Sequence, residues 1–103
     1  IAGDAASSIA IGTQPADATV AATNTQAFTV ATTVTGAGSA TYQWQLSTNA
    51  GVDFADISGA TNATYTTPAT AAGDNGNQYR VKVNTTAGAV EVVSSAATLT
   101  VTE

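Results

Sequence analysis

Residues 41–47, which read Thr-Tyr-Gln-Trp-Gln-Leu-Ser, alternate between large apolar and polar side chains. Successive side chains of a β-strand point to opposite faces, so Tyr42, Trp44 and Leu46 share one face and the two glutamines share the other. The stretch therefore predicts a strand whose apolar face carries the single tryptophan of the chain.

The same alternation continues on both sides of this strand. Residues 26–35 and 78–84 also predict strands, and their apolar faces carry Phe28, Val30, Thr32 and Val34 in the first and Tyr79, Val81 and Val83 in the second. Arg80 and Lys82 fall on the opposite face of the later strand. Residues 89–102 change the parity of their apolar positions near Ser94 and Ser95, which predicts one extra residue, a bulge.

Turn-forming residues separate these stretches at intervals of about 8–12 residues, as in β-sandwiches. We expect shorter strands at residues 8–11, 18–22, 52–57 and 63–67, and a single helical turn near residues 69–72. The total of seven to nine strands predicts one all-β, antiparallel sandwich. Residues 1–8 are small and polar and are interpreted as an N-terminal arm or linker, and residues 9–103 as the domain.

The charge of the chain excludes two classes of partner. Only 9% of the residues are charged, and Arg80 and Lys82 are the only cations in a chain of net charge −5. Nucleic-acid binding and docking to anionic lipid both need clusters of cations. No apolar run approaches the roughly 18 residues of a membrane span. We therefore expect no nucleic-acid partner and no membrane insertion. Because the chain begins at Ile1 rather than Met, we expect a processed product or part of a longer protein.

Residues that support catalysis are scarce. The chain has no His and no Cys, so it lacks the commonest general base and the best nucleophile. Asp53 and Asp56 are interpreted as solvated turn residues rather than a glycosidase pair. Asp4, Asp17 and Asp74 leave calcium as an alternative, because this ion binds oxygen ligands in loops, although turn hydrogen bonding is the simpler interpretation. We expect no enzyme and no cofactor, with calcium as the alternative.

Several segments together resemble a known family. Residues 42–45 (YQWQ) lie on the third main strand, residues 74–81 (DNGNQYRV) open a late strand, and residues 97–101 (ATLTV) form the last one. With residues 14–15 (QP) and 56–61 (DISGAT), this ordered set resembles an immunoglobulin-like domain. More narrowly, it is similar to the cysteine-free versions in bacterial surface proteins and tailed-phage virions. The resemblance spans residues 9–101 and implies a Greek-key sandwich.

The resemblance also implies roles for single residues. Trp44 resembles the tryptophan that packs between the sheets, and Tyr79 resembles the tyrosine whose hydroxyl bonds nearby backbone in the tyrosine corner. Val30 and Val81 stand where the family has its two disulfide cysteines. Gly76 and Tyr79 are one residue further apart than in the usual Asp-x-Gly-x-Tyr spacing. The expected core is therefore Phe28, Val30, Trp44, Tyr79, Val81 and Leu99.

Two roles remain open. The first is a non-catalytic structural or interaction module of a secreted, cell-surface or virion-surface protein, with protein neighbours in a larger chain or assembly as partners. The second is a carbohydrate-binding or adhesive module that contacts surface glycans through its end loops, residues 36–40, 48–52 and 70–77. For the first role we expect the arm to dock against a neighbouring subunit, or against its own sheet edge, by strand addition. The arm residues concerned are Ile1, Ala2, Gly3 and Asp4.

Overall fold

The computed structural model describes residues 8–36, 38–86 and 91–102 of the chain. Within these residues it contains ten strands and one short 3₁₀ helix. In chain order they are β1 (Ser8–Thr13), β2 (Ala18–Ala21), β3 (Ala27–Thr29), β4 (Ala31–Thr35), β5 (Ala40–Ser47), β6 (Ala55–Asp56), β7 (Thr64–Thr66), η2 (Ala72–Asp74), β8 (Gln78–Thr85), β9 (Val92–Val93) and β10 (Ala97–Thr102). The described part of the chain contains no helix that could span a bilayer.

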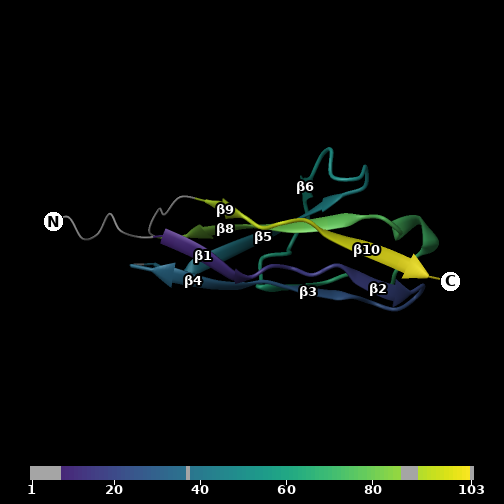
Figure 1. Ribbon diagram of the computed structural model, residues 1–103, viewed down its shortest axis with the longest axis horizontal. Coiled ribbons are helices and arrows are strands. Elements are labelled where there is room, and N and C mark those ends of the chain that lie inside the picture. Colours follow the sequence, from purple (N-terminus) through teal and green to yellow (C-terminus); the bar gives the residue numbers. More distant parts are fainter. Residues whose placement is uncertain (1–7, 37, 87–90, 103) are drawn as a thin grey trace.

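The strands form two facing layers (Figure 1). One layer contains the pairs β1–β4 and β3–β7. The other runs in the order β2-β10-β8-β5-β6, and β9 also pairs with β8. All pairs are antiparallel except β2 with β10, which are parallel. Strands that are distant in the chain are thus neighbours in space, as the expected Greek-key sandwich requires. The all-β sandwich class is confirmed.

The strand predicted at residues 26–35 is divided in two, because the chain changes partner at Val30. β3 pairs with β7 and β4 pairs with β1, and Val30 donates its N–H to the Ala63 carbonyl at 3.0 Å. The alternation continues through the change: Phe28 and Val30 are buried, and Thr32 and Val34 are half-buried. This division is one reason why ten strands are present where seven to nine were expected.

The space between the layers is filled by the large apolar side chains. The six residues assigned to the core from the sequence are at most 4% exposed: Phe28, Val30, Trp44, Tyr79, Val81 and Leu99. Trp44 satisfies its polar end by donating from Nε1 to the Asn62 carbonyl at 2.7 Å. The ring of Tyr79 stacks on that of Phe28, with centroids 4.9 Å apart, and lies 5.7 Å from Tyr65. Aromatic packing thus links both layers at the centre of the domain.

The expected extra residue lies between β9 and β10. β8 places Lys82 opposite Val93 and Tyr79 opposite Ala97, so four steps along the last stretch match three along β8. Ser94, in this bulged segment, is buried and accepts the Val81 N–H at 2.9 Å through its hydroxyl.

The helical turn is η2, which lies further along the chain than residues 69–72. The Asp74 carboxylate accepts the Ala71 N–H at 3.0 Å, and this bond holds the turn at its position.

Candidate functional site

The carboxylates of the described residues accept hydrogen bonds that hold the fold. Asp17 accepts the Thr98 N–H at 2.8 Å and so ties the loop before β2 to β10. Asp74 accepts the Ala71 N–H, as described above. The other carboxylate acceptors are Asp53 for the Asn49 amide, Asp56 for the Gln45 amide and Glu91 for the Asn84 amide. These bonds agree with the turn interpretation of Asp17 and Asp74. Asp4 lies outside the described residues.

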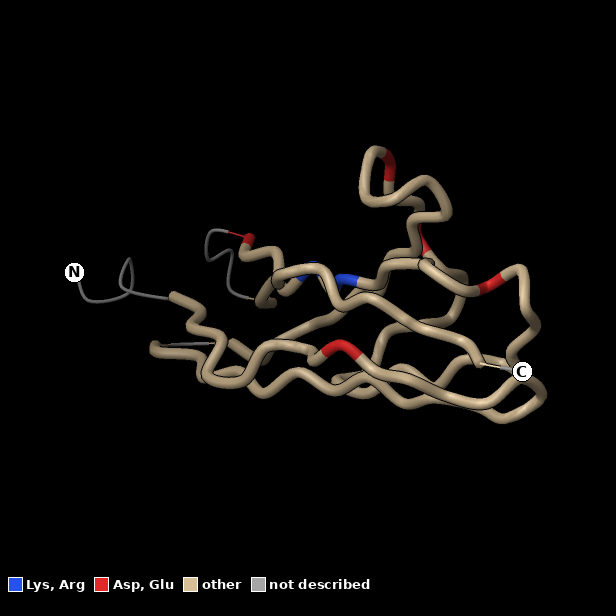
Figure 2. Tube along the Cα trace, turned by 45° about the vertical axis from the view of Figure 1, so that its right-hand side comes forward, with Lys and Arg blue, Asp and Glu red and all other residues tan. Residues whose placement is uncertain are grey.

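The described residues contain no cluster of side chains that could form the calcium site considered as an alternative. Within them, no group of three or more His, Cys, Asp or Glu side chains is placed to hold an ion. Figure 2 shows the acidic residues spread along the molecule rather than gathered.

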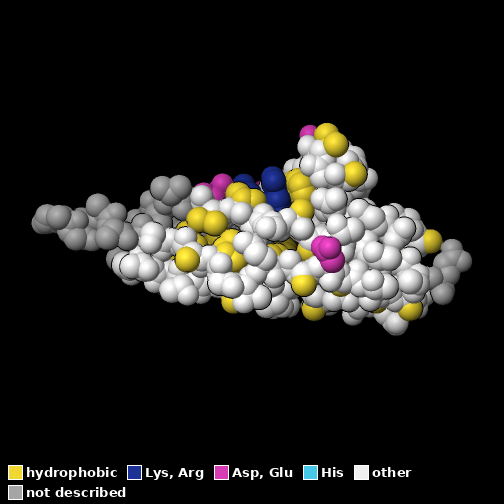
Figure 3. Space-filling view, viewed as in Figure 1, with side chains coloured by type: hydrophobic (Ala, Val, Ile, Leu, Met, Phe, Trp, Pro, Cys, Tyr) yellow, Lys and Arg dark blue, Asp and Glu magenta, His cyan; other side chains and the backbone are white. Residues whose placement is uncertain are grey.

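A small polar network covers the outer face of β5 and β8. Arg80 donates from Nε to Gln45 Oε1 at 2.8 Å, and Gln45 donates from Nε2 to Asp56 Oδ1 at 2.7 Å. The Arg80 guanidinium also lies 4.0 Å from the centre of the Phe54 ring, a cation–π contact. Gln45 is only 7% exposed as a result, although it faces away from the core. The network anchors the β5–β6 hairpin, which projects from the sandwich (Figures 1 and 3).

An ion pair between Lys82 and Glu91, which facing strands at residues 78–84 and 89–102 would allow, is not formed. The register places Val93 opposite Lys82, and Glu91 accepts a hydrogen bond from the Asn84 side chain at 2.9 Å. The two cations of the chain therefore differ: Arg80 is held within the polar network, whereas Lys82 lies two positions further along β8 and so on the same face of that strand.

The three end loops do not form one surface. Residues 36–40 precede β5 and residues 48–52 follow it, so these two loops lie at opposite ends of that strand. Ser39 exchanges hydrogen bonds with Thr86, whereas Thr70 donates to the carbonyl of Asn24 beside β2. The three loops therefore cannot all contact one small ligand, because antiparallel strands carry successive loops to alternate ends.

Two tyrosines belong to the packed interior: Tyr79 is buried and Tyr65 is half-buried. Burial raises the pKa of Tyr65, and the nearby Asp74 charge raises it further. Burial likewise is the main cause that raises the pKa of Tyr79, and a hydrogen bond with the Asn77 side chain partly opposes it. Both tyrosines stay neutral at physiological pH and do not supply a base.

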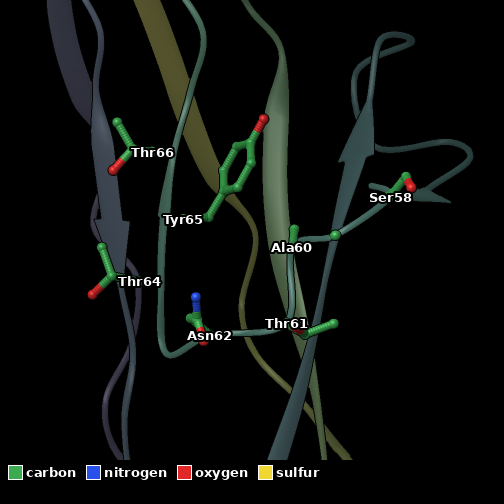
Figure 4. Close-up of a pocket in the computed structure, with 8 residues that line it drawn as sticks. Ser58, Ala60, Thr61, Asn62, Thr64, Tyr65 and Thr66 are labelled. Carbon is green, nitrogen blue, oxygen red and sulfur yellow. The ribbon is translucent and has the colours of Figure 1, made fainter.

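A hollow with a volume of about 340 Å³ opens beside β7 (Figure 4). Its lining residues share short, uncharged side chains, apart from one aromatic ring: Ser58, Gly59, Ala60, Thr61, Asn62, Thr64, Tyr65 and Thr66. The Tyr65 ring points to the opposite side of the strand from the Thr64 and Thr66 side chains (Figure 4). Such a lining offers hydrogen bonds but no charge, so it suits an uncharged ligand.

This pocket was not predicted from the sequence. It lies partly within residues 56–61, which were noted only for the family resemblance. Two signals mark the region: residues 57–73 contain no charged residue, and Pro68 follows the short strand, as is common at sheet edges.

Comparisons with known proteins agree with the geometry. A family model described as a domain of unknown function (DUF8696) matches residues 10–103. No curated protein matches the chain. A solved chimeric titin Z1Z2-Z1Z2 tandem (Z1212), functionalised with a GRGDS peptide from fibronectin, is 16% identical with a TM-score of 0.64. The match covers 94% of this chain and 51% of the tandem, so the chain spans about half of that structure.

A second solved structure is the titin M10–obscurin-like 1 Ig complex. It is 18% identical with a TM-score of 0.61, and the match covers 94% of this chain and 96% of the other. Both likenesses show that the fold is an immunoglobulin-like sandwich.

Proposed function

We propose that this chain, which belongs to the DUF8696 family of domains of unknown function, is a non-catalytic structural or interaction module. It would serve as a spacer, display or assembly domain with protein neighbours as partners and with no cofactor. The observation that carries the proposal is the use of the polar side chains. The carboxylates at Asp17, Asp53, Asp56, Asp74 and Glu91 all hold loops or strands, and Arg80 anchors a hairpin.

The proposal is tested by replacing the carboxylates singly with amides and measuring stability and turnover together. We expect Asp17→Asn to lower the free energy of unfolding by about 1 kcal/mol, because a charged acceptor of a backbone N–H is weakened. We expect no hydrolysis of chromogenic esters or glycosides by the purified chain. Turnover that disappears in one carboxylate variant, while the fold persists, would overturn the non-catalytic role. Light scattering with and without calcium completes the test, and a calcium-dependent mass would contradict the absence of a cofactor.

We also propose that the domain is of the bacterial or phage type and is displayed outside the cell or on a virion. The complete lack of Cys and the low charge support this proposal, since the core holds together through Trp44, Val30 and Val81 without a disulfide. Antibody labelling of intact cells or purified particles tests the location. Labelling that requires permeabilised cells would contradict it.

The arm is part of this proposal. Ile1, Ala2, Gly3 and Asp4 lie outside the described residues. The arm is followed in the sequence by β1, which among the described strands pairs only with β4 and is therefore an outer strand of its layer. We expect it to dock against a neighbouring subunit. Deleting residues 1–7 should lower the mass measured by light scattering, and an unchanged mass would refute docking by the arm.

Carbohydrate binding is the second candidate function, and one observation favours it. The pocket beside β7 combines hydroxyl and amide groups with the Tyr65 ring and carries no charge. A glycan array with the wild-type chain and an Asn62→Ala variant tests this role. Binding of a neutral glycan that the variant loses would support it.

A further inference from the structure

Strand β7 is an outer strand of its layer. Among the described strands it pairs only with β3, through Ala27–Thr66, Phe28–Tyr65 and Thr29–Thr64. Its other side faces the pocket and solvent, and both Thr64 and Thr66 are exposed. An outer strand offers unpaired backbone groups to another strand.

The register shows which backbone groups face outward. Thr67 donates its N–H to the Gln26 carbonyl at 2.8 Å, and Val30 donates to the Ala63 carbonyl at 3.0 Å. Hydrogen-bonded pairs alternate along an antiparallel ladder, so Tyr65 also bonds toward β3. The N–H and C=O groups of Thr64 and Thr66 therefore point away from β3, toward the open edge.

This row of outward groups has defined ends. At one end, the Asn62 carbonyl already accepts the indole N–H of Trp44 at 2.7 Å. At the other end, Pro68 has no N–H to donate. The open edge thus consists of two donors and two acceptors, and it is symmetric about Tyr65.

Charge singles out this edge as a place where two copies can meet. The chain has a net charge of −5, so most contacts between copies bring like charges together. Residues 57–73 contain no charged side chain, and β7 lies at the centre of this segment. Natural edge strands usually carry charges that prevent such pairing, and this one does not.

We propose that β7 pairs antiparallel with β7 of a second copy, with Tyr65 on the two-fold axis. Thr64 then exchanges N–H···O=C bonds with Thr66 of the second copy, and Thr66 with Thr64 of the second copy, so all four outward groups are satisfied. An isologous contact of this kind closes after two copies. The inference rests on the proposed role as an assembly module and names the partner and the surface.

The paired segment is short, so the contact is weak between free copies. It falls in the class of small interfaces that bury less than about 1,200 Å². Copies that are tethered in a larger chain or assembly meet at high effective concentration, which strengthens such a contact without new bonds.

Single cysteines introduced into this cysteine-free chain test the pairing. In the proposed register the Cα atoms of Thr64 and of Thr66 of the second copy are about 5.5 Å apart, within disulfide range. The Cα atoms of Thr64 in both copies are about 8–9 Å apart, too far to bridge. A mixture of Thr64→Cys and Thr66→Cys chains at about 1 mM and under mild oxidation should form mixed dimers.

The controls define the outcome. Each variant alone, and a Thr33→Cys chain whose cysteine lies on β4 outside the proposed contact, should give only the slow background of random collisions. A Thr64→Cys chain that also carries Thr66→Lys should form less mixed dimer with the Thr66→Cys chain. Its melting temperature should be unchanged. Mixed dimers no faster than the Thr33→Cys background would refute the pairing.

Nuclear magnetic resonance spectra of the backbone amides, recorded at several concentrations of the wild-type chain, test the pairing independently. The Thr64 and Thr66 amide signals should shift between dilute solution and about 1 mM, while that of Thr33 stays constant. Shifts that occur only when a neutral sugar is added would overturn the pairing and assign the edge to a glycan. The carboxylate series above is unaffected by either result, so the module role and the pairing fail separately.

Discussion

Replacing Trp44 by alanine measures how much of the fold depends on one side chain. Trp44 is fully buried between the layers, and its ring lies 6.3 Å from that of Tyr65. Its indole N–H also donates to the Asn62 carbonyl and so fixes the segment before β7. Truncation therefore opens a cavity at the centre of the sandwich and removes a hydrogen bond at its edge.

The expected cost follows from these two losses. Replacing a buried Trp by a small residue costs about 3–5 kcal/mol of stability. The lost hydrogen bond accounts for about 1 kcal/mol of this cost. A domain of this size has a total stability of roughly 5–15 kcal/mol. We expect Trp44→Ala to lose about 4 kcal/mol. Trp44→Phe keeps a large aromatic ring and loses the N–H and a smaller part of the buried volume, so about 1–2 kcal/mol is expected.

The assay is urea unfolding followed by far-ultraviolet circular dichroism, because the variants lack the single fluorescent tryptophan. Val93→Ala is the matched control, since Val93 is 41% exposed, and it should change stability by less than about 0.5 kcal/mol. If the alanine variant does not fold, the phenylalanine variant still gives a graded result. A loss below about 1 kcal/mol for Trp44→Ala would show that the core does not depend on this residue.

Three further predictions concern other parts of the sandwich. Above about pH 10 the stability should fall, because burial raises the pKa values of Tyr65 and Tyr79 and the unfolded chain releases these protons first. Tyr65→Phe should flatten this fall in pH-dependent melts, and an unchanged slope would contradict the assignment. Ser94→Ala should cost about 1–3 kcal/mol in urea melts, since a buried backbone N–H loses its acceptor, and a neutral result would mean that water replaces the hydroxyl. Phe54→Ala should speed hydrogen exchange in β6 by removing the contact with Arg80, whereas unchanged exchange would show that the hydrogen bonds alone anchor the hairpin.

The sequence predicted the parts of the fold that depend on neighbouring residues. The alternation at residues 41–47 and 78–84 correctly identified which side chains face inward, because successive residues of a strand point to opposite faces whatever their partners are. The parity change near Ser94 likewise revealed the bulge, since one extra residue inverts the pattern locally. Trp44 and Tyr79 are accordingly buried.

The candidate site was not predicted, because it depends on contacts between distant residues. No local pattern shows that Gln45 is covered by Arg80, which is 35 positions away, or that the three end loops lie at opposite ends. Nor does a local pattern show that Val93 lies opposite Lys82, since a shift in the pairing of two strands changes every opposite residue.

Composition and alternation alone thus determined the all-β class, the faces of the strands and the absence of His and Cys. Tertiary structure alone decided that Val30 is the point where the chain changes partner, that β2 runs parallel to β10 and that β7 is left as an outer strand. The physical reason is that the direction of a side chain depends on the local backbone. The partner of each backbone hydrogen bond depends on which distant strand packs beside it.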